Sequence, residues 1–129
     1  MFNRDAIKAY QTAEQDYLVE GADPHSLVQI LFSEFLASLE LTIEALEKKD
    51  LAAKSKHISK AMTIVHVLAT SLDFERGGEV AQSLAQLYDW ARRKLIEASF
   101  QNSIPAINEV HNSISEISTA WNTINAKAA

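Results

Sequence analysis

The sequence contains no cysteine, which excludes a disulfide framework, a thiolate metal site and redox chemistry at a thiol. It also lacks an apolar run at its start, because the first residues, MFNRDAIKAYQTAEQDYL, carry five charged side chains. This segment therefore resembles neither a secretion signal nor a membrane anchor. The working expectation is a cytoplasmic protein.

Glycine is scarce, with three in the chain, two of them adjacent at Gly77-Gly78. The sequence lacks a phosphate-binding glycine loop and the G-x-S-x-G elbow of serine hydrolases. It also lacks the Glu-x-x-His pairs of di-iron bundles, because no histidine has a glutamate three residues before it. We therefore expect no catalytic activity, no cofactor and no metal site. His66, within HVLATSLD, leaves one alternative open: a helical bundle that transfers phosphate through an exposed histidine.

Acidic residues outnumber basic ones, with 17 Asp and Glu against 12 Lys and Arg and a net charge of −5. A nucleic-acid-binding protein needs a concentrated basic surface to neutralise phosphates, so this balance disfavours that class. We identify one basic cluster, Arg92-Arg93-Lys94. We interpret it as an ordinary solvated face near the end of a helix, where cations offset the helix dipole.

Helical periodicity runs through four stretches, and none shows sustained strand alternation. We predict helices over residues 24–48, 51–72, 79–99 and 104–125. Asp23-Pro24 and Asp50 are start signals, and Gly77-Gly78 is expected to end the second helical segment. Short links make consecutive helices antiparallel. Residues 1–129 are therefore predicted to form one all-α domain, an up-down four-helix bundle preceded by a short helical or extended segment, 1–22.

Each predicted helix has an apolar stripe that should face the core. The stripe of the fourth helix is the most regular, with steps of three and four residues, as in a helix packed along its length. The four stripes begin at Val28, Leu51, Val80 and Ile107, and they end at Leu46, Leu72, Ala98 and Ile124.

Several apolar residues miss these stripes when each helix is projected at about 100° per residue. A single apolar residue outside the stripe is common and is explained by a position at the boundary of a wide core. Together, on three helices, they amount to more apolar surface than one four-helix core uses, which is typical of a groove for a partner. The predicted partner-binding residues on the helices are Leu27, Ile30, Leu41, Ile64, Val67, Trp90 and Ile96.

The N-terminal segment adds Ile7 and Tyr10 to the predicted partner-binding residues. They are three residues apart and share a face if this stretch is helical. A helical turn this short does not hold together alone in water, so it needs an apolar surface to pack on. We therefore expect Ile7 and Tyr10 to cover part of the partner site and to move when the partner binds.

Several stretches, in order along the chain, resemble the FliS family of flagellar export chaperones. They include IKAYQ, DPHSLVQILF, LEKKDLAAKSKHISKAM and the closing AWNTI. The most specific is SLDFERGGEVAQSLAQLYDWARRKLIEA, with its glycine pair, its L-Y-D followed by an aromatic residue, and its basic pair. The chain departs from the family pattern at LFSE, where L-Y-D-G is common, at Trp90, where Tyr is common, and at SFQNS, where N-L-R-N-D is common.

The resemblance implies an antiparallel bundle that binds the C-terminal region of flagellin and keeps it from polymerising in the cytosol. It implies that the bundle presents flagellin to the flagellar type III export gate. It also implies that the segment around AIKAY packs on the bundle and is displaced by flagellin. Neither nucleic-acid binding nor membrane insertion is expected, and whether the free protein is a monomer or a homodimer stays open.

Overall fold

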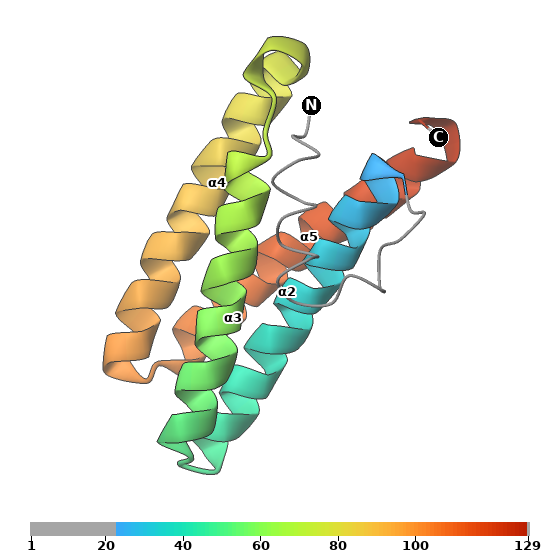
Figure 1. Ribbon diagram of the computed structural model, residues 1–129. Helices are drawn as coiled ribbons and strands as arrows, with labels where there is room; N and C mark the ends of the chain where they lie inside the picture. The colour runs from blue at the N-terminus through green and yellow to red at the C-terminus, as the bar shows by residue number, and fades with distance from the viewer. Residues whose placement is uncertain (1–22, 129) are drawn as a thin grey trace.

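The computed structural model describes residues 23–128, with side chains as far as Ile124. This part of the chain forms four helices, α2 (Pro24–Glu47), α3 (Leu51–Thr70), α4 (Phe74–Gln101) and α5 (Ile104–Ala128). Consecutive helices pack against each other, and α5 returns to pack against α2, which closes the ring (Figure 1). The predicted all-α four-helix bundle is confirmed. The predicted N-terminal segment, with Ile7 and Tyr10, lies outside the described residues.

Aspartates begin three of the helices. Asp23 Oδ1 accepts a hydrogen bond from the backbone N–H of Ser26 at 2.7 Å, and this bond lowers the pKa of the Asp23 carboxyl. Asp50 and Asp73 accept backbone N–H groups at the starts of α3 and α4 in the same way. Each cap satisfies a donor that the first helical turn leaves without an intrahelical partner.

The link between α2 and α3 turns through Lys49, which has a φ of 58°. The N–H of Asp50 donates to the carbonyl of Ala45 at 2.8 Å, and the N–H of Lys49 donates to that of Leu46 at 3.1 Å. These two bonds form a Schellman motif, in which a left-handed residue closes the helix. Because Asp50 also caps α3, the two helices form a tight antiparallel hairpin.

A lysine of α3 supports the link between α4 and α5. Lys54 Nζ donates to the carbonyl of Ser99 and to Oδ1 of Asn102, both at 2.9 Å. The last carbonyls of α4 carry the negative end of its dipole, so a cation is favourable there. The first turn of α3 is thereby tied to the end of α4.

The prediction that the glycine pair ends the second helix is wrong. α3 ends at Thr70, and α4 begins at Phe74. Gly78 then interrupts α4 with a φ of 50° and a ψ of −126°, a conformation that disfavours any residue with a Cβ. An added Cβ would meet no atom within 4 Å, so the backbone conformation and not crowding requires glycine there. The pair therefore kinks α4 after its first turn.

The core is centred on α2, where Phe32 and Phe35 have no exposed surface. The first half of α5 packs into the same cluster of buried side chains. The predicted stripes are wrong at three helix ends, because Leu51, Val80 and Ile124 are 57%, 58% and 53% exposed. An apolar stripe continues to the end of its helix, but burial stops where the neighbouring helices no longer cover it.

The start of α2 is joined to α5 by a reciprocal pair of hydrogen bonds. Trp121 Nε1 donates to the carbonyl of His25 at 3.0 Å, and His25 Nε2 donates to the carbonyl of Trp121 at 2.8 Å. The two rings stack with centroids 4.5 Å apart, and Phe32 meets the indole edge-on at 6.3 Å. One turn further along, Gln29 Nε2 donates to Ser118 Oγ at 2.9 Å.

α2 is also long and apolar enough to cross a membrane, by length and composition alone. Helices buried in bundle cores meet the same test, and 44% of the apolar window of α2 is buried inside the bundle. Its packing against both α3 and α5 is sufficient to explain its apolar composition.

Tyr88 on α4 is 1% exposed, and its hydroxyl has no hydrogen-bond partner among the described residues. We expect Tyr88→Phe to raise the free energy of unfolding by about 1 kcal/mol, because the variant no longer buries an unsatisfied polar group. Urea denaturation at neutral pH measures this difference. A loss of stability of similar size would show that the hydroxyl has a partner.

The stability of the same variant should also depend differently on pH in the alkaline range. Burial raises the pKa of Tyr88, whereas the phenol of the unfolded chain ionises near pH 10. The native protein therefore keeps its full stability below about pH 9 and loses stability as the pH rises through about 10, since the unfolded state then releases the proton first. The free energy of unfolding of Tyr88→Phe should therefore fall less than that of the wild type above about pH 9, because the other ionising groups affect both proteins alike. Urea denaturation at several alkaline pH values measures the difference.

Candidate functional site

Five of the predicted partner-binding residues lie along one face of the bundle, between α2 and α3. The middle of this face is an open groove whose lining includes Glu34 on α2 and Lys60 and Thr63 on α3. Residues three, four or seven apart share a helix face. By this spacing the seam between α2 and α3 continues from the groove to Leu27 and Ile30 on α2 and to Ile64 and Val67 on α3. Of the five residues, only Leu41 lines the groove itself.

Three of these five residues are not surface residues. Leu27, Ile64 and Val67 are 5%, 0% and 9% exposed, so the inference that they lie outside the core is wrong. Each helix packs against two neighbours, and its buried arc is therefore wider than the stripe that the sequence pattern marks. Ile30 is half-buried against the core, and Leu41 is 44% exposed. Their contact with a partner stays a prediction.

The other two predicted residues lie on α4, away from this face. Trp90 is half-buried and packs against the core. It lies four residues before Lys94, whose ammonium pairs with Glu109 of α5 at 2.9 Å, so the indole is on the side of α4 that faces α5. Ile96 is 39% exposed, and Phe100, one turn later, is 86% exposed. The structure therefore separates the predicted residues of α4 from those of α2 and α3, and it places Trp90 and Ile96 on different sides of α4.

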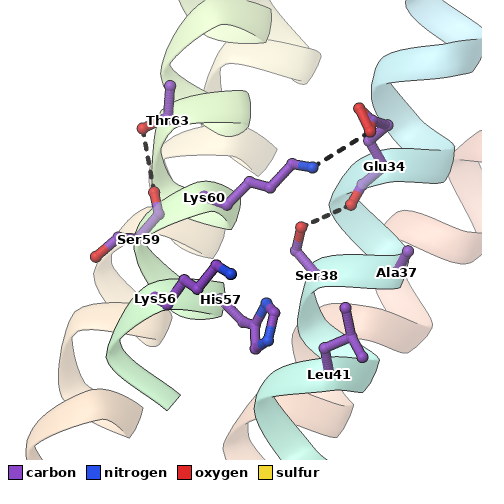
Figure 2. Close-up of a pocket in the computed structure, with 9 residues that line it drawn as sticks. All are labelled: Glu34, Ala37, Ser38, Leu41, Lys56, His57, Ser59, Lys60 and Thr63. Carbon is purple, nitrogen blue, oxygen red and sulfur yellow. Dashed lines mark hydrogen bonds and ion pairs between the residues drawn. The ribbon is translucent and has the colours of Figure 1, made fainter. Parts of the chain in front are cut away.

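The groove between α2 and α3 is open and has a volume of about 580 Å³. Figure 2 shows His57 and Lys60 on α3 facing Leu41 and Glu34 on α2. One ion pair crosses the groove among the residues that line it, between Lys60 Nζ and Glu34 Oε1 at 3.3 Å. A smaller hollow of about 160 Å³ continues toward the α2–α3 link and shares Leu41 and His57 with the groove.

The sequence analysis missed the lysines of α3 that line one wall of the groove, Lys56 and Lys60. Five of the twelve Lys and Arg residues fall within residues 48–60, and this clustering could have indicated them. The predicted basic cluster on α4 is ion-paired: Arg92 and Arg93 both bind Asp89 at 3.0 Å. The Glu109 carboxylate pairs with Lys94 and raises the pKa of its ammonium. The interpretation of the α4 cluster as an ordinary solvated face agrees with this arrangement.

The histidines are dispersed over the bundle. His25 bonds to Trp121, His111 Nε2 lies 2.8 Å from Glu40 Oε2, and His57 lines the groove. His66 is exposed on α3. Within residues 23–128, no group of three or more His, Asp or Glu side chains is placed to hold a metal ion. The exposure of His66 is compatible with the alternative of phosphotransfer, which stays a prediction.

We expect Ile64→Ala to lower the free energy of unfolding by about 2–5 kcal/mol, because it removes buried methyl groups and leaves a cavity. Ile124→Ala is the matched control at an exposed position, and it should change the stability by less than about 0.5 kcal/mol. Urea denaturation of both variants tests this contrast. An Ile64→Ala variant as stable as the control would show that Ile64 is not buried in the core.

Comparison with known proteins places this bundle in a family. The model of the flagellar protein FliS family matches residues 6–128. The chain is 38% identical to the flagellar secretion chaperone FliS of Salmonella typhimurium, over all of this chain and 96% of that protein. It is 34% identical to FliSB of Pseudomonas aeruginosa, over 96% and 98% of the two chains, and 30% identical to FliS of Vibrio cholerae, over 94% and 89%. The chain therefore belongs to the FliS family of flagellar secretion chaperones.

Proposed function

We propose that this protein is a cytoplasmic, non-enzymatic export chaperone for flagellin. It binds the C-terminal region of flagellin, keeps it from polymerising and delivers it to the flagellar export gate. The observation that carries the proposal is the match to FliS along nearly the whole chain, with relatives named flagellar secretion chaperones. The absence of cysteine agrees with a reducing compartment.

The physical basis of such a chaperone is apolar surface left over after the bundle has formed its core. On α4, Ile96 and Phe100 are exposed one turn apart, and Trp90 is half-buried on another side of the same helix. On α2, Ile30 is half-buried at the rim of the α2–α3 face. A polymerising segment of flagellin would bury its own apolar residues on these side chains and so be withheld from other flagellin molecules.

Calorimetric titration with a peptide of the flagellin C-terminal region tests this proposal. Trp90→Ala and Ile96→Ala should each weaken binding by about 1 kcal/mol or more, which is roughly fivefold, because partly exposed aromatic and aliphatic side chains dominate such interfaces. Leu51→Ala is the control, since Leu51 is an exposed apolar residue at the start of α3. If the wild-type protein does not bind the peptide, the proposed function is refuted. If both variants bind it as tightly as the wild type, only the assignment of Trp90 and Ile96 to the binding surface is refuted.

The proposal includes Ile7 and Tyr10 as a cover for the partner site in the free protein. Contacts worth more than a few kcal/mol would reduce flagellin affinity by the same amount, so the cover must pack weakly. We expect backbone amides of residues 6–11 to show weak protection from hydrogen exchange in the free protein and to lose it when flagellin binds. Protection that stays constant or rises on binding would mean a fixed part of the fold or a direct flagellin contact.

A further inference from the structure

Phe100, in the last turn of α4, is the most exposed large apolar side chain among the residues that the structure describes. It is 86% exposed, whereas the other exposed large apolar side chains range from 39% to 58%. It extends the α4 surface proposed for flagellin, because it follows Ile96 by one turn. Aromatic side chains bury a large apolar area on binding and are enriched at protein interfaces.

A contact at the end of a helix depends on the last turn staying folded. The final carbonyl groups of a helix lack intrahelical partners, so this turn frays unless other groups bind them. α4 has no basic residue in its last turn to offset its dipole. The backbone N–H groups of Asn102 and Ser103 both donate to the carbonyl of Ala98, which accounts for one of the final carbonyls.

Lys54 of α3 supplies the cation that the last turn of α4 lacks. Its ammonium donates to the carbonyl of Ser99 and to Oδ1 of Asn102, both at 2.9 Å. These two acceptors lie on either side of Phe100 in the chain, one residue before it and two residues after it. The hydrogen bonds from α3 therefore hold the turn that carries the aromatic side chain.

We propose that Lys54 is a positioning residue for flagellin binding, because it keeps the last turn of α4 folded and so holds Phe100 ready for the cargo. An apolar side chain of the flagellin segment packs on Phe100. The turn is ordered before binding, so its ordering does not reduce the affinity. Lys54 acts through Phe100 and does not contact flagellin itself. This inference rests on the proposed function and adds to it the residue that keeps the binding surface in place.

A double-mutant cycle on the full-length protein, measured by calorimetric titration with the flagellin peptide, tests the proposal. We expect Lys54→Met to weaken binding about fivefold and Phe100→Ala to weaken it about tenfold. Because Lys54 acts through Phe100, the double variant should bind about as weakly as Phe100→Ala alone. Independent effects would instead multiply to about fiftyfold.

Two further variants control for the charge of Lys54. Lys54→Arg should keep the affinity within about twofold of the wild type, because guanidinium N–H groups can bind the same two acceptors. Lys48→Met removes a lysine whose side chain is 70% exposed and pairs with Glu44 inside α2. This variant should also change the affinity by less than about twofold.

Hydrogen exchange of the free protein tests the physical cause. Backbone amides of residues 100–103 should exchange about tenfold faster in Lys54→Met than in the wild type, while those of residues 88–95 should keep their rates. Unchanged exchange at residues 100–103 would overturn the proposal, because Lys54 would then not hold the turn.

The binding data separate this inference from the proposed function. Wild-type protein that does not bind the peptide would refute both. If the wild type binds, the inference alone is overturned by unchanged affinity in Phe100→Ala or in Lys54→Met, or by an equal loss in Lys48→Met or Lys54→Arg. It is also overturned if Lys54→Met weakens binding further in the Phe100→Ala background, which would make Lys54 a direct contact.

Thermal melting confirms that each variant is folded. If Lys54→Met unfolds the bundle, Asn102→Gly replaces it in the cycle. Glycine adopts the φ of 52° at this position without strain and removes one of the two acceptors of Lys54. Asn102→Gly should weaken binding about twofold, and this loss should likewise vanish in the Phe100→Ala background. A loss that persists in that background would overturn the proposal.

Discussion

The packing of α2 against two neighbours at once is the constraint on which the rest of this structure depends. α3 covers one side of α2 and α5 covers another, so α2 must be apolar over a wide arc. Phe32 and Phe35 fill the centre of that arc, and Leu27 and Leu31 extend it toward one side. The reciprocal bonds of His25 and Trp121 set the position of α5 along α2, since each ring is both stacked and hydrogen-bonded. The bundle closes because α2 accepts both contacts.

The α2–α3 groove follows from the size of the side chains at this seam. Midway along both helices the seam holds Ala37, Ser38 and Ser59, and these small residues leave the open volume that Leu41, Lys56 and Lys60 border. Ser38 is buried, and its hydroxyl donates to the carbonyl of Glu34 at 2.8 Å, so it needs no partner across the seam. Toward one end, larger side chains such as Ile64 are fully buried. One pair of helices thus provides buried core toward one end and an open groove midway along its length.

A chaperone of this kind has to present apolar surface without losing its own fold. In this bundle, the buried apolar residues and the exposed apolar residues lie on different sides of the same helices. On α4, Tyr88 and Leu95 point into the core, while Ile96 and Phe100 remain exposed. Charged residues between them are held in local pairs such as Arg92 with Asp89, which keeps the surface soluble beside the apolar patch.

The four helices, their starts at Asp23 and Asp50 and the core of α5 could be predicted from the sequence, because caps and helical periodicity are local properties that repeat every few residues. The family resemblance was also readable from the chain, and the family match confirms it. The burial of Ile64 and the exposure of Leu41, by contrast, follow only from how the helices pack. Both residues miss the apolar stripe of their helix, but burial depends on which neighbouring helix covers that side, and no local pattern encodes the neighbour. The same reason explains why the groove between α2 and α3 was not predicted, since it exists only where α3 brings Lys56 and Lys60 opposite α2.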